Sequence, residues 1–205
     1  MSAIEYYDHA LNPEECDRLI ELFENSPYKT QGVTGSSYGN HINKDIKSSI
    51  QIDCNLSDQS DRSGEINKII IPKLTSCMNE YSNKYTALSH ISKWTLTGDY
   101  TFQKFETEND GFKGWHTEHG ERFPFCYRMM VWTLYLNDAA GTEFMHYETV
   151  PAKKGRCAIW PSSWEYVHRS EANRNTKYIL SGWMSYVLPM PLIEGLRGVH
   201  DQYDA

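Results

Sequence analysis

Two residues that can bind a metal ion lie close together in the segment Gly114–Gly120, which reads GWHTEHG. His116 and Glu118 are two positions apart, and the side chains of residues i and i+2 of a β-strand point to the same face. An imidazole and a carboxylate at this spacing can therefore bind one ion. A third ligand has to come from elsewhere in the chain, and His168 is the best candidate.

Two histidines and one carboxylate on one face of a metal ion, with the opposite face open, form the arrangement associated with non-haem Fe(II) oxygenases. A His-x-Glu pair alone occurs often by chance. The order of the parts along the chain is more specific, because a long predicted strand and a distal histidine follow the pair, and a cation, Lys177, lies nine residues further on. We therefore predict a metal site formed by His116, Glu118 and His168.

Lys177 begins a largely apolar segment, residues 177–187, that we predict as a strand. With period two, Lys177, Ile179 and Ser181 share one face of this strand. A lysine buried there needs an anionic partner, and the carboxylate of a bound ligand can serve, with the Ser181 hydroxyl adding a hydrogen bond. Considered alone, the lysine fits better at the solvent-exposed edge of the strand.

Residues 127–136 are apolar on both alternating faces, as expected for a central strand that is covered on both sides. Tyr135 lies on the face of Val131 and Thr133. Its hydroxyl needs a partner if it is buried, and that partner is either the carboxylate bound by Lys177 or another group of the protein core.

Composition narrows the class of protein. The chain has 205 residues, a net charge of -7 and a pI near 5.6, which argues against general binding to nucleic acid or to anionic membranes. Its five cysteines are scattered without a CxxC pair, so neither a disulfide framework nor a structural zinc site is indicated. We expect a cytoplasmic protein, because the first residues are acidic and no apolar run reaches the length of about 18 residues that spans a bilayer.

The pattern of elements predicts an α+β fold, a double-stranded β-helix (jelly roll) with N-terminal helices packed against one sheet. Helices are expected from Asn12-Pro13 to about residue 25 and over 65–85, with Pro72 as a kink. The polar segment 28–47 is predicted to be a loop or weak hairpin that could act as a lid. Strands are expected at 4–7, 48–53, 90–97, 100–106, 114–118, 127–136, 143–146, 156–160, 164–168 and 177–187. We predict one domain over 1–205, with a helical part at about 1–88, a jelly-roll core at about 89–188 and a tail at 189–205.

With these residues in this order, the chain resembles the 2-oxoglutarate/Fe(II)-dependent dioxygenases, specifically their prolyl 4-hydroxylase-like branch. The resemblance covers roughly residues 5–188 and is most specific over 103–186. The matching segments are the His-x-Glu pair, YLND at 135–138, GTEF at 141–144, the approach to the distal histidine at 151–156, Lys177, SGW at 181–183 and the helix start LNPEEC at 11–16.

The resemblance implies that His116, Glu118 and His168 bind the iron. The chain departs from the family pattern at Glu118, where aspartate is usual. Glutamate is one methylene longer, so the ligand geometry has to shift. Related halogenating enzymes lack this carboxylate, so its presence favours hydroxylation.

The resemblance also implies that Lys177 forms an ion pair with the distal carboxylate of 2-oxoglutarate, helped by Tyr135 and Ser181. The implied cofactors are Fe(II), 2-oxoglutarate and O2, with ascorbate as a further candidate. The implied reaction hydroxylates a C–H bond of a peptidyl proline or another amino-acid-like substrate and releases succinate and CO2. A peptide, a protein or a small molecule therefore remains open as the substrate.

Two other classes of protein remain open. A cupin-like metal enzyme that is not an oxygenase would need the three ligands but not Lys177, and a non-catalytic jelly-roll binding module would need neither. We expect Arg128 and Arg169 to be solvated charges at the rim of the site and Trp183 to lie near the metal. Core or cavity-wall positions are expected for Trp115, Trp132, Trp160 and Trp164.

Overall fold

The structure, a computed structural model, describes residues 2–36 and 39–187, so the predicted tail at 189–205 lies outside the described residues. Seven antiparallel strands form a large sheet in the spatial order β1-β12-β9-β14-β7-β6-β2. Their bounds are β1 Glu5–Tyr7, β12 Cys157–Pro161, β9 Arg128–Tyr135, β14 Lys177–Tyr186, β7 Trp94–Phe105, β6 Ile50–Asn55 and β2 Thr30–Gln31. Most of the sheet is therefore built from the second half of the chain, whereas β1, β2 and β6 come from the segment predicted to be mainly helical.

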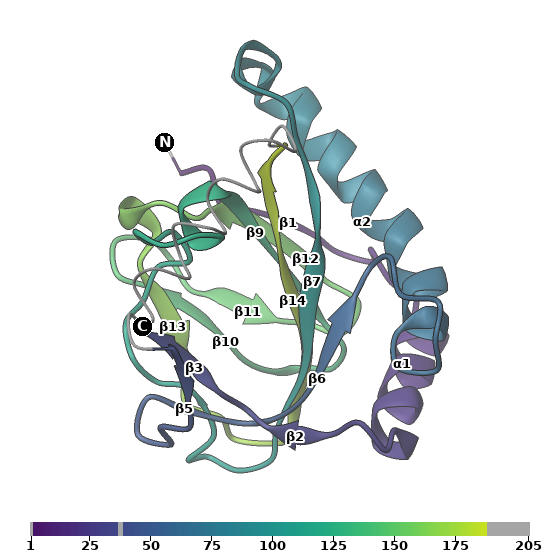
Figure 1. Cartoon of the computed structure of the whole chain (residues 1–205). Helices are drawn as coiled ribbons and strands as arrows, with labels where there is room; N and C mark the ends of the chain where they lie inside the picture. The colour runs from purple at the N-terminus through teal and green to yellow at the C-terminus, as the bar shows by residue number, and fades with distance from the viewer. Residues whose placement is uncertain (1, 37–38, 188–205) are drawn as a thin grey trace.

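Smaller sheets complete the β-structure. A three-stranded sheet has the order β11-β10-β13, and two strand pairs, β3–β4 and β5–β8, lie in the connecting segments. Their bounds are β10 Ala139–Phe144, β11 Val150–Ala152, β13 His168–Ser170, β3 Thr34–Ser36, β4 Gly39–His41, β5 Lys47–Ser48 and β8 Gly111–Phe112. Figure 1 shows β10, β11 and β13 on one side of the large sheet and the two long helices on the other.

The first helix, α1 (Pro13–Asn25), begins with a capping box. The Asn12 side chain accepts a hydrogen bond from the Glu15 backbone N–H at 2.8 Å, and the Glu15 carboxylate accepts one from the Asn12 backbone N–H at 2.9 Å. Pro13 occupies the first turn, where its missing N–H costs nothing. These contacts fix the start of α1, as the sequence around Asn12 predicts.

The second helix, α2 (Gly64–Lys84), contains Pro72 in its interior. Its apolar residues recur every three or four positions, so one face of the helix is buried. Buried side chains of both helices belong to one hydrophobic cluster with the outward-facing strand residues, including Phe23, Ile70 and Leu74 from the helices and Phe102 and Trp132 from the sheet. Burial of this surface supplies the main favourable free energy that holds the helices on the sheet.

The opposite face of the large sheet contributes to a second cluster, shared with the three-stranded sheet. Strand β14 shows the division clearly, because Leu180 and Met184 belong to the helix-side cluster and Ile179 and Trp183 contact the inner one. This is the alternation predicted from period two. The inner face therefore carries Lys177, Ser181 and their neighbours toward the interior between the sheets.

Several predicted strands are wrong in their extent. Residues 90–97 and 100–106 contribute to one continuous strand, β7, and residues 164–168 begin with a short 3-10 helix, η3 (Trp164–Tyr166). The segment 114–118 is not a strand, because His116 alone makes an isolated antiparallel bridge to His168. Two further 3-10 turns lie at η1 (Thr86–His90) and η2 (Phe125–Tyr127).

The polar segment 28–47 contains β2, the hairpin β3–β4 and the start of β5, and residues 37–38 at the hairpin turn lie outside the described residues. A role for this segment as a lid stays a prediction. Neither described helix combines the length and the apolar character needed to cross a lipid bilayer.

The close contact at Gly182 predicts a measurable loss of stability. A Cβ added there would lie 2.4 Å from Trp132 Cζ2 and 2.9 Å from Tyr100 Cβ, both in the buried helix-side cluster. We expect Gly182→Ala to lower the free energy of unfolding by about 1–3 kcal/mol, because the core has to shift to accept the methyl group. Urea denaturation measures this. Gly98→Ala is the control, since its Cβ would meet only the end of the Asn55 side chain; equal losses in both variants would contradict the prediction.

Candidate metal and cofactor site

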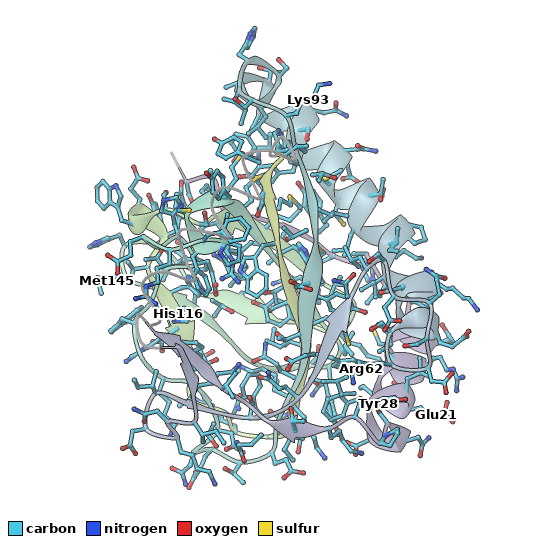
Figure 2. All side chains as sticks on the ribbon, viewed as in Figure 1. Glu21, Tyr28, Arg62, Lys93, His116 and Met145 are labelled. Atoms are coloured by element: carbon cyan, nitrogen blue, oxygen red, sulfur yellow. The ribbon has the colours of Figure 1, made fainter. Side chains whose placement is uncertain are left out.

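The two histidines predicted as metal ligands face each other across the isolated bridge. The His116 N–H donates to the His168 carbonyl at 3.0 Å, the His168 N–H donates to the His116 carbonyl at 2.9 Å, and the ring centroids are 4.4 Å apart. Two segments that are distant in the sequence are thereby held in register at the two ligand positions. His116, labelled in Figure 2, lies on the side of the large sheet away from the two helices.

Each imidazole has a defined tautomer. Nδ1 of His116 lies 2.9 Å from the Gly114 carbonyl, and Nδ1 of His168 lies 2.9 Å from the Tyr166 carbonyl. A carbonyl only accepts hydrogen bonds, so Nδ1 carries the proton in both rings. In the neutral form of each ring the lone pair is then on Nε2, which is the atom that the ring turns toward Glu118. A hydrogen bond from the far nitrogen is how metal-binding histidines are commonly oriented.

Glu118 divides its two carboxylate oxygens between different partners. Oε1 lies 3.5 Å from His116 Nε2 and 3.9 Å from His168 Nε2. Oε2 accepts hydrogen bonds from Arg128 Nη1 and from Trp183 Nε1, each at 3.0 Å. One oxygen is therefore held by the protein, and the other faces the two imidazoles. The three ligand atoms lie within 4.8 Å of one another.

The charges in this cluster suit metal binding. Burial alone would raise the pKa of Glu118, but the hydrogen bond and charge of His116, with the charges of Arg128 and His168, bring the pKa below its ordinary value. Burial lowers the pKa of His168 to about 4, and the charge of His116 acts in the same direction. At neutral pH the site therefore presents a carboxylate and a neutral imidazole, the forms that bind a metal ion.

Aromatic rings enclose the ligands. Phe112 stacks on His116 with 3.6 Å between centroids, and Trp160 and Phe144 lie 5.1 Å and 5.6 Å from the His168 ring. Apolar walls fix the ring orientations and lower the local dielectric constant around the three ligands. Phe112 and Trp160 line part of a cavity of about 590 Å³ that also has all three ligands in its wall.

Arg128 is not the solvated rim charge that we expected. Its side chain is 12% exposed, its guanidinium lies 3.4 Å from the centroid of the Trp183 ring, and it pairs with Glu118. Residue type and period two do not distinguish a rim position from an interior one at the end of a strand. Trp183 lies beside the ligands, as predicted. Trp164, predicted as core or cavity wall, is 74% exposed.

Lys177 is buried, with 2% of its surface exposed, so its placement at a solvent edge is wrong. Its ammonium lies 5.0 Å from the centroid of Phe105, and within the described residues it makes no hydrogen bond or close ion pair. Burial lowers the pKa of Lys177 to about 8, and the negative charge of Glu171 opposes that shift. An ammonium group in this position is poorly compensated unless an anion binds next to it.

The two predicted hydroxyl contacts have protein partners. Tyr135 Oη lies 2.7 Å from Thr142 Oγ1, and Ser181 Oγ lies 2.8 Å from Thr133 Oγ1. Ser181, Thr133 and Thr142 line the cavity that holds the metal ligands. Tyr135 and Lys177 are not among its lining residues, but their contact partners Thr142 and Phe105 are.

Sequence reasoning missed several residues of the cavity wall. Thr133 could have been found, because period two places it on the face of Val131 and Tyr135. Thr142 lies in the GTEF segment that carries part of the resemblance, yet no role follows from its residue type alone. Phe112 and Lys47 come from the short pair β5–β8, whose two-residue strands leave no periodic signal.

The hydrogen bonds to Glu118 Oε2 predict an effect on metal affinity. Trp183→Phe keeps an aromatic ring but removes the Nε1–H donor, so the carboxylate loses part of its orientation. We expect metal affinity to fall by about 10-fold or more, as for other groups that orient a ligand. Calorimetric titration with Mn(II) measures it, and Trp164→Phe, on the exposed surface, is the matched control. Unchanged affinity in Trp183→Phe would show that this bond does not position the ligand.

Comparison with protein-family models gave no match, and no curated protein matched the sequence. Solved structures do match. A prolyl hydroxylase from Trichoplax adhaerens, in complex with a peptide fragment of the hypoxia inducible factor oxygen degradation domain, has a TM-score of 0.64 at 12% identity. That match covers 91% of this chain and 84% of the other chain.

Two further structures give the same result. A Pseudomonas putida prolyl-4-hydroxylase has a TM-score of 0.62 at 13% identity, with 92% of this chain and 95% of the other covered. The viral collagen prolyl hydroxylase of Paramecium Bursaria Chlorella virus-1, in its 2OG complex, has a TM-score of 0.57 at 17% identity, with 90% and 97% covered. The predicted jelly-roll class is thereby confirmed: this chain has the fold that these prolyl hydroxylases share.

Proposed function

We propose that the protein is an Fe(II)- and 2-oxoglutarate-dependent dioxygenase that hydroxylates a C–H bond of a peptidyl proline or another amino-acid-like substrate, with release of succinate and CO2. The observation that carries the proposal is the combination of two features in one interior. His116, Glu118 and His168 converge on one point, and the buried ammonium of Lys177 lacks a close anionic partner among the described residues.

The donor set fits Fe(II). Two imidazoles and one carboxylate, with the other side of the site open to the cavity, are the ligands of non-haem iron oxygenases. A metal enzyme that does not use 2-oxoglutarate would need these ligands, but it would have no use for a buried cation of this kind. Lys177 therefore favours the dioxygenase over the cupin-like alternative.

Each protein group would have a separate task. His116, Glu118 and His168 would hold the iron, and Arg128 and Trp183 would keep Glu118 Oε2 away from it. Iron, 2-oxoglutarate and O2 would together supply the oxidising chemistry.

At the cofactor end, the Lys177 ammonium would pair with the distal carboxylate of 2-oxoglutarate. The hydroxyls of Ser181 and Tyr135 would assist its orientation, the latter directly or through Thr142. Because lysine offers a point charge without the planar fork of arginine, these hydroxyls would carry much of the orientation. The Phe105 ring, 5.0 Å from the ammonium, would shield the ion pair from water.

A peptide substrate is supported by the similar Trichoplax adhaerens structure, which contains a peptide fragment. A cytoplasmic location is supported by the five cysteines, which are all free thiols and suit a reducing compartment. The net charge of -7 gives no support for nucleic acid as a partner.

Anaerobic addition of Fe(II) and 2-oxoglutarate tests the proposal. We expect a weak visible charge-transfer band in the wild type and none in His168→Ala. In Lys177→Met the metal should still bind, but 2-oxoglutarate affinity should fall at least about 30-fold, because a buried charge loses its partner. Lys153→Met, at an exposed lysine, is the control. A wild-type protein without the band contradicts the proposal, and unchanged 2-oxoglutarate binding in Lys177→Met supports the cupin-like alternative.

The pKa of Lys177 predicts a pH dependence of cofactor binding. Below pH 8 the amine is protonated and attracts the carboxylate, whereas above pH 8 the neutral amine has lost that attraction. We expect 2-oxoglutarate affinity to be constant from pH 6 to 7.5 and to decline progressively above pH 8. Lys177→Arg should show no such decline, because arginine stays charged. Parallel pH profiles of the two proteins, measured by anaerobic titration, would argue against Lys177 as the carboxylate partner.

A further inference from the structure

A second buried lysine, Lys47, lines the cavity that contains the metal ligands. Across the inner face of the large sheet, the register aligns Tyr135 of β9, Ile179 of β14, Gln103 of β7 and Gln51 of β6 in one row. Lys47 of β5 adds to the β6 end of this row, since its Nζ donates to Gln51 Oε1 at 2.8 Å. Lys47 therefore approaches the cavity from β6, whereas Lys177 belongs to β14.

Lys47 is also close to the metal ligands. In the strand pair β5–β8 it lies opposite Phe112, and Phe112 stacks on the His116 ring. Lys47 is 7% exposed and lines the cavity together with His116 and Glu118. A ligand that contacts Lys47 from within the cavity would therefore lie near the metal site.

The ammonium of Lys47 has unused donors. It carries three N–H groups, and one is directed at Gln51 Oε1. Within the part of the chain that the structure describes, no carboxylate lies close enough to form an ion pair with it. The negative charges of Glu118 and Asp53 act on Lys47 from a greater distance. Both carboxylates already have hydrogen-bond partners: Glu118 accepts from Arg128 and Trp183, and Asp53 accepts from Gln51 Nε2 at 2.6 Å.

Two arginines of the cavity wall, unlike Lys47, form ion pairs with carboxylates. Arg128 pairs with Glu118 at 3.0 Å, and Arg169 pairs with Glu143 at 2.6 Å. Among the described residues, the close partner of Lys47 is the neutral amide of Gln51. Burial lowers the pKa of Lys47 to about 8, so the group still carries its charge at neutral pH. A buried positive charge of this kind favours the binding of an anion beside it.

We propose that Lys47 binds a carboxylate of the substrate, held close to the C–H bond that reacts. Gln51 is a positioning residue that directs the ammonium into the cavity. This inference rests on the proposed function, and it narrows the substrate to amino-acid-like molecules with a carboxylate. The carboxylate belongs either to the main chain of a free amino acid or to an acidic side chain next to the target residue of a peptide.

The strands that separate the two lysines support a different ligand for each. Strand β7 and strand β6 lie between β14, which carries Lys177, and the β5 segment, which carries Lys47. The two ammonium groups would therefore bind separate anions. 2-Oxoglutarate would occupy the place at Lys177, which leaves Lys47 for the substrate.

Succinate release from 2-oxoglutarate tests the inference with matched probes. One set pairs free L-amino acids with their amides, and the other pairs N-acetyl-Glu-Pro-amide with N-acetyl-Gln-Pro-amide. In the wild type we expect at least one acid to have a kcat/KM about 30-fold or more above that of its neutral partner. Lys47→Met should reduce that ratio to near one, Lys47→Arg should keep most of it, and Lys44→Met, at an exposed position, should leave it unchanged.

A preference among the free amino acids would assign the carboxylate to the main chain of the substrate, whereas a preference for N-acetyl-Glu-Pro-amide would assign it to an acidic side chain of a peptide. The inference is overturned if no acid is preferred in the wild type, or if Lys47→Met keeps the preference. The anaerobic Fe(II)·2-oxoglutarate band separates this inference from the proposed function. The band should be unchanged in Lys47→Met, and its loss there alone would assign Lys47 to the cofactor. Its absence from the wild type would instead contradict the proposed function.

Discussion

The pair of backbone hydrogen bonds between His116 and His168 is the constraint on which the site depends. It joins the segment after β8 to the start of β13 at the two residues whose side chains bear the ligand nitrogens. A hydrogen-bonded antiparallel pair sets the Cα separation at about 5.5 Å, so both rings project from adjacent points. The bonds from each Nδ1 to a carbonyl then set the rotation of the rings. Backbone geometry thus determines the position of two ligands before any metal is present.

The buried charged side chains of the interior differ in whether a partner of opposite charge lies close to them. Glu118 is compensated by Arg128 and the imidazoles, and Arg169 is compensated by Glu143. Among the described residues, Lys177 and Lys47 are buried without a close carboxylate, the first on β14 and the second beside Gln51 of β6. Because uncompensated buried charges destabilise a fold, their retention in the interior is best explained by ligands that complete them. The two lysines are therefore the positions at which we propose that anionic ligands bind.

Sequence reasoning predicted the features that follow from local periodicity. The alternation of β14 placed Lys177 and Ser181 on the inner face correctly, and the capping residues fixed the start of α1. The extended segment at 114–118 was wrong, because the ligands are held by a single bridge and no continuous ladder forms. The burial of Arg128 and Lys47 could not be predicted, since it depends on which side chains from other strands surround them. Short strands such as β5 and β8 contain too few residues for a repeating pattern.

The edges of the large sheet have a consequence for how a polypeptide could reach the cavity. The sheet ends at β1, with three residues, and at β2, with two, so each edge offers few unpaired backbone groups. Short edge strands of this kind discourage pairing with a further strand, and so protect against aggregation. A peptide would thus gain little by extending the sheet. Such a peptide would have to be recognised through its side chains and its termini. Recognition would then depend on a few residues near the cavity and not on a long segment paired with the sheet.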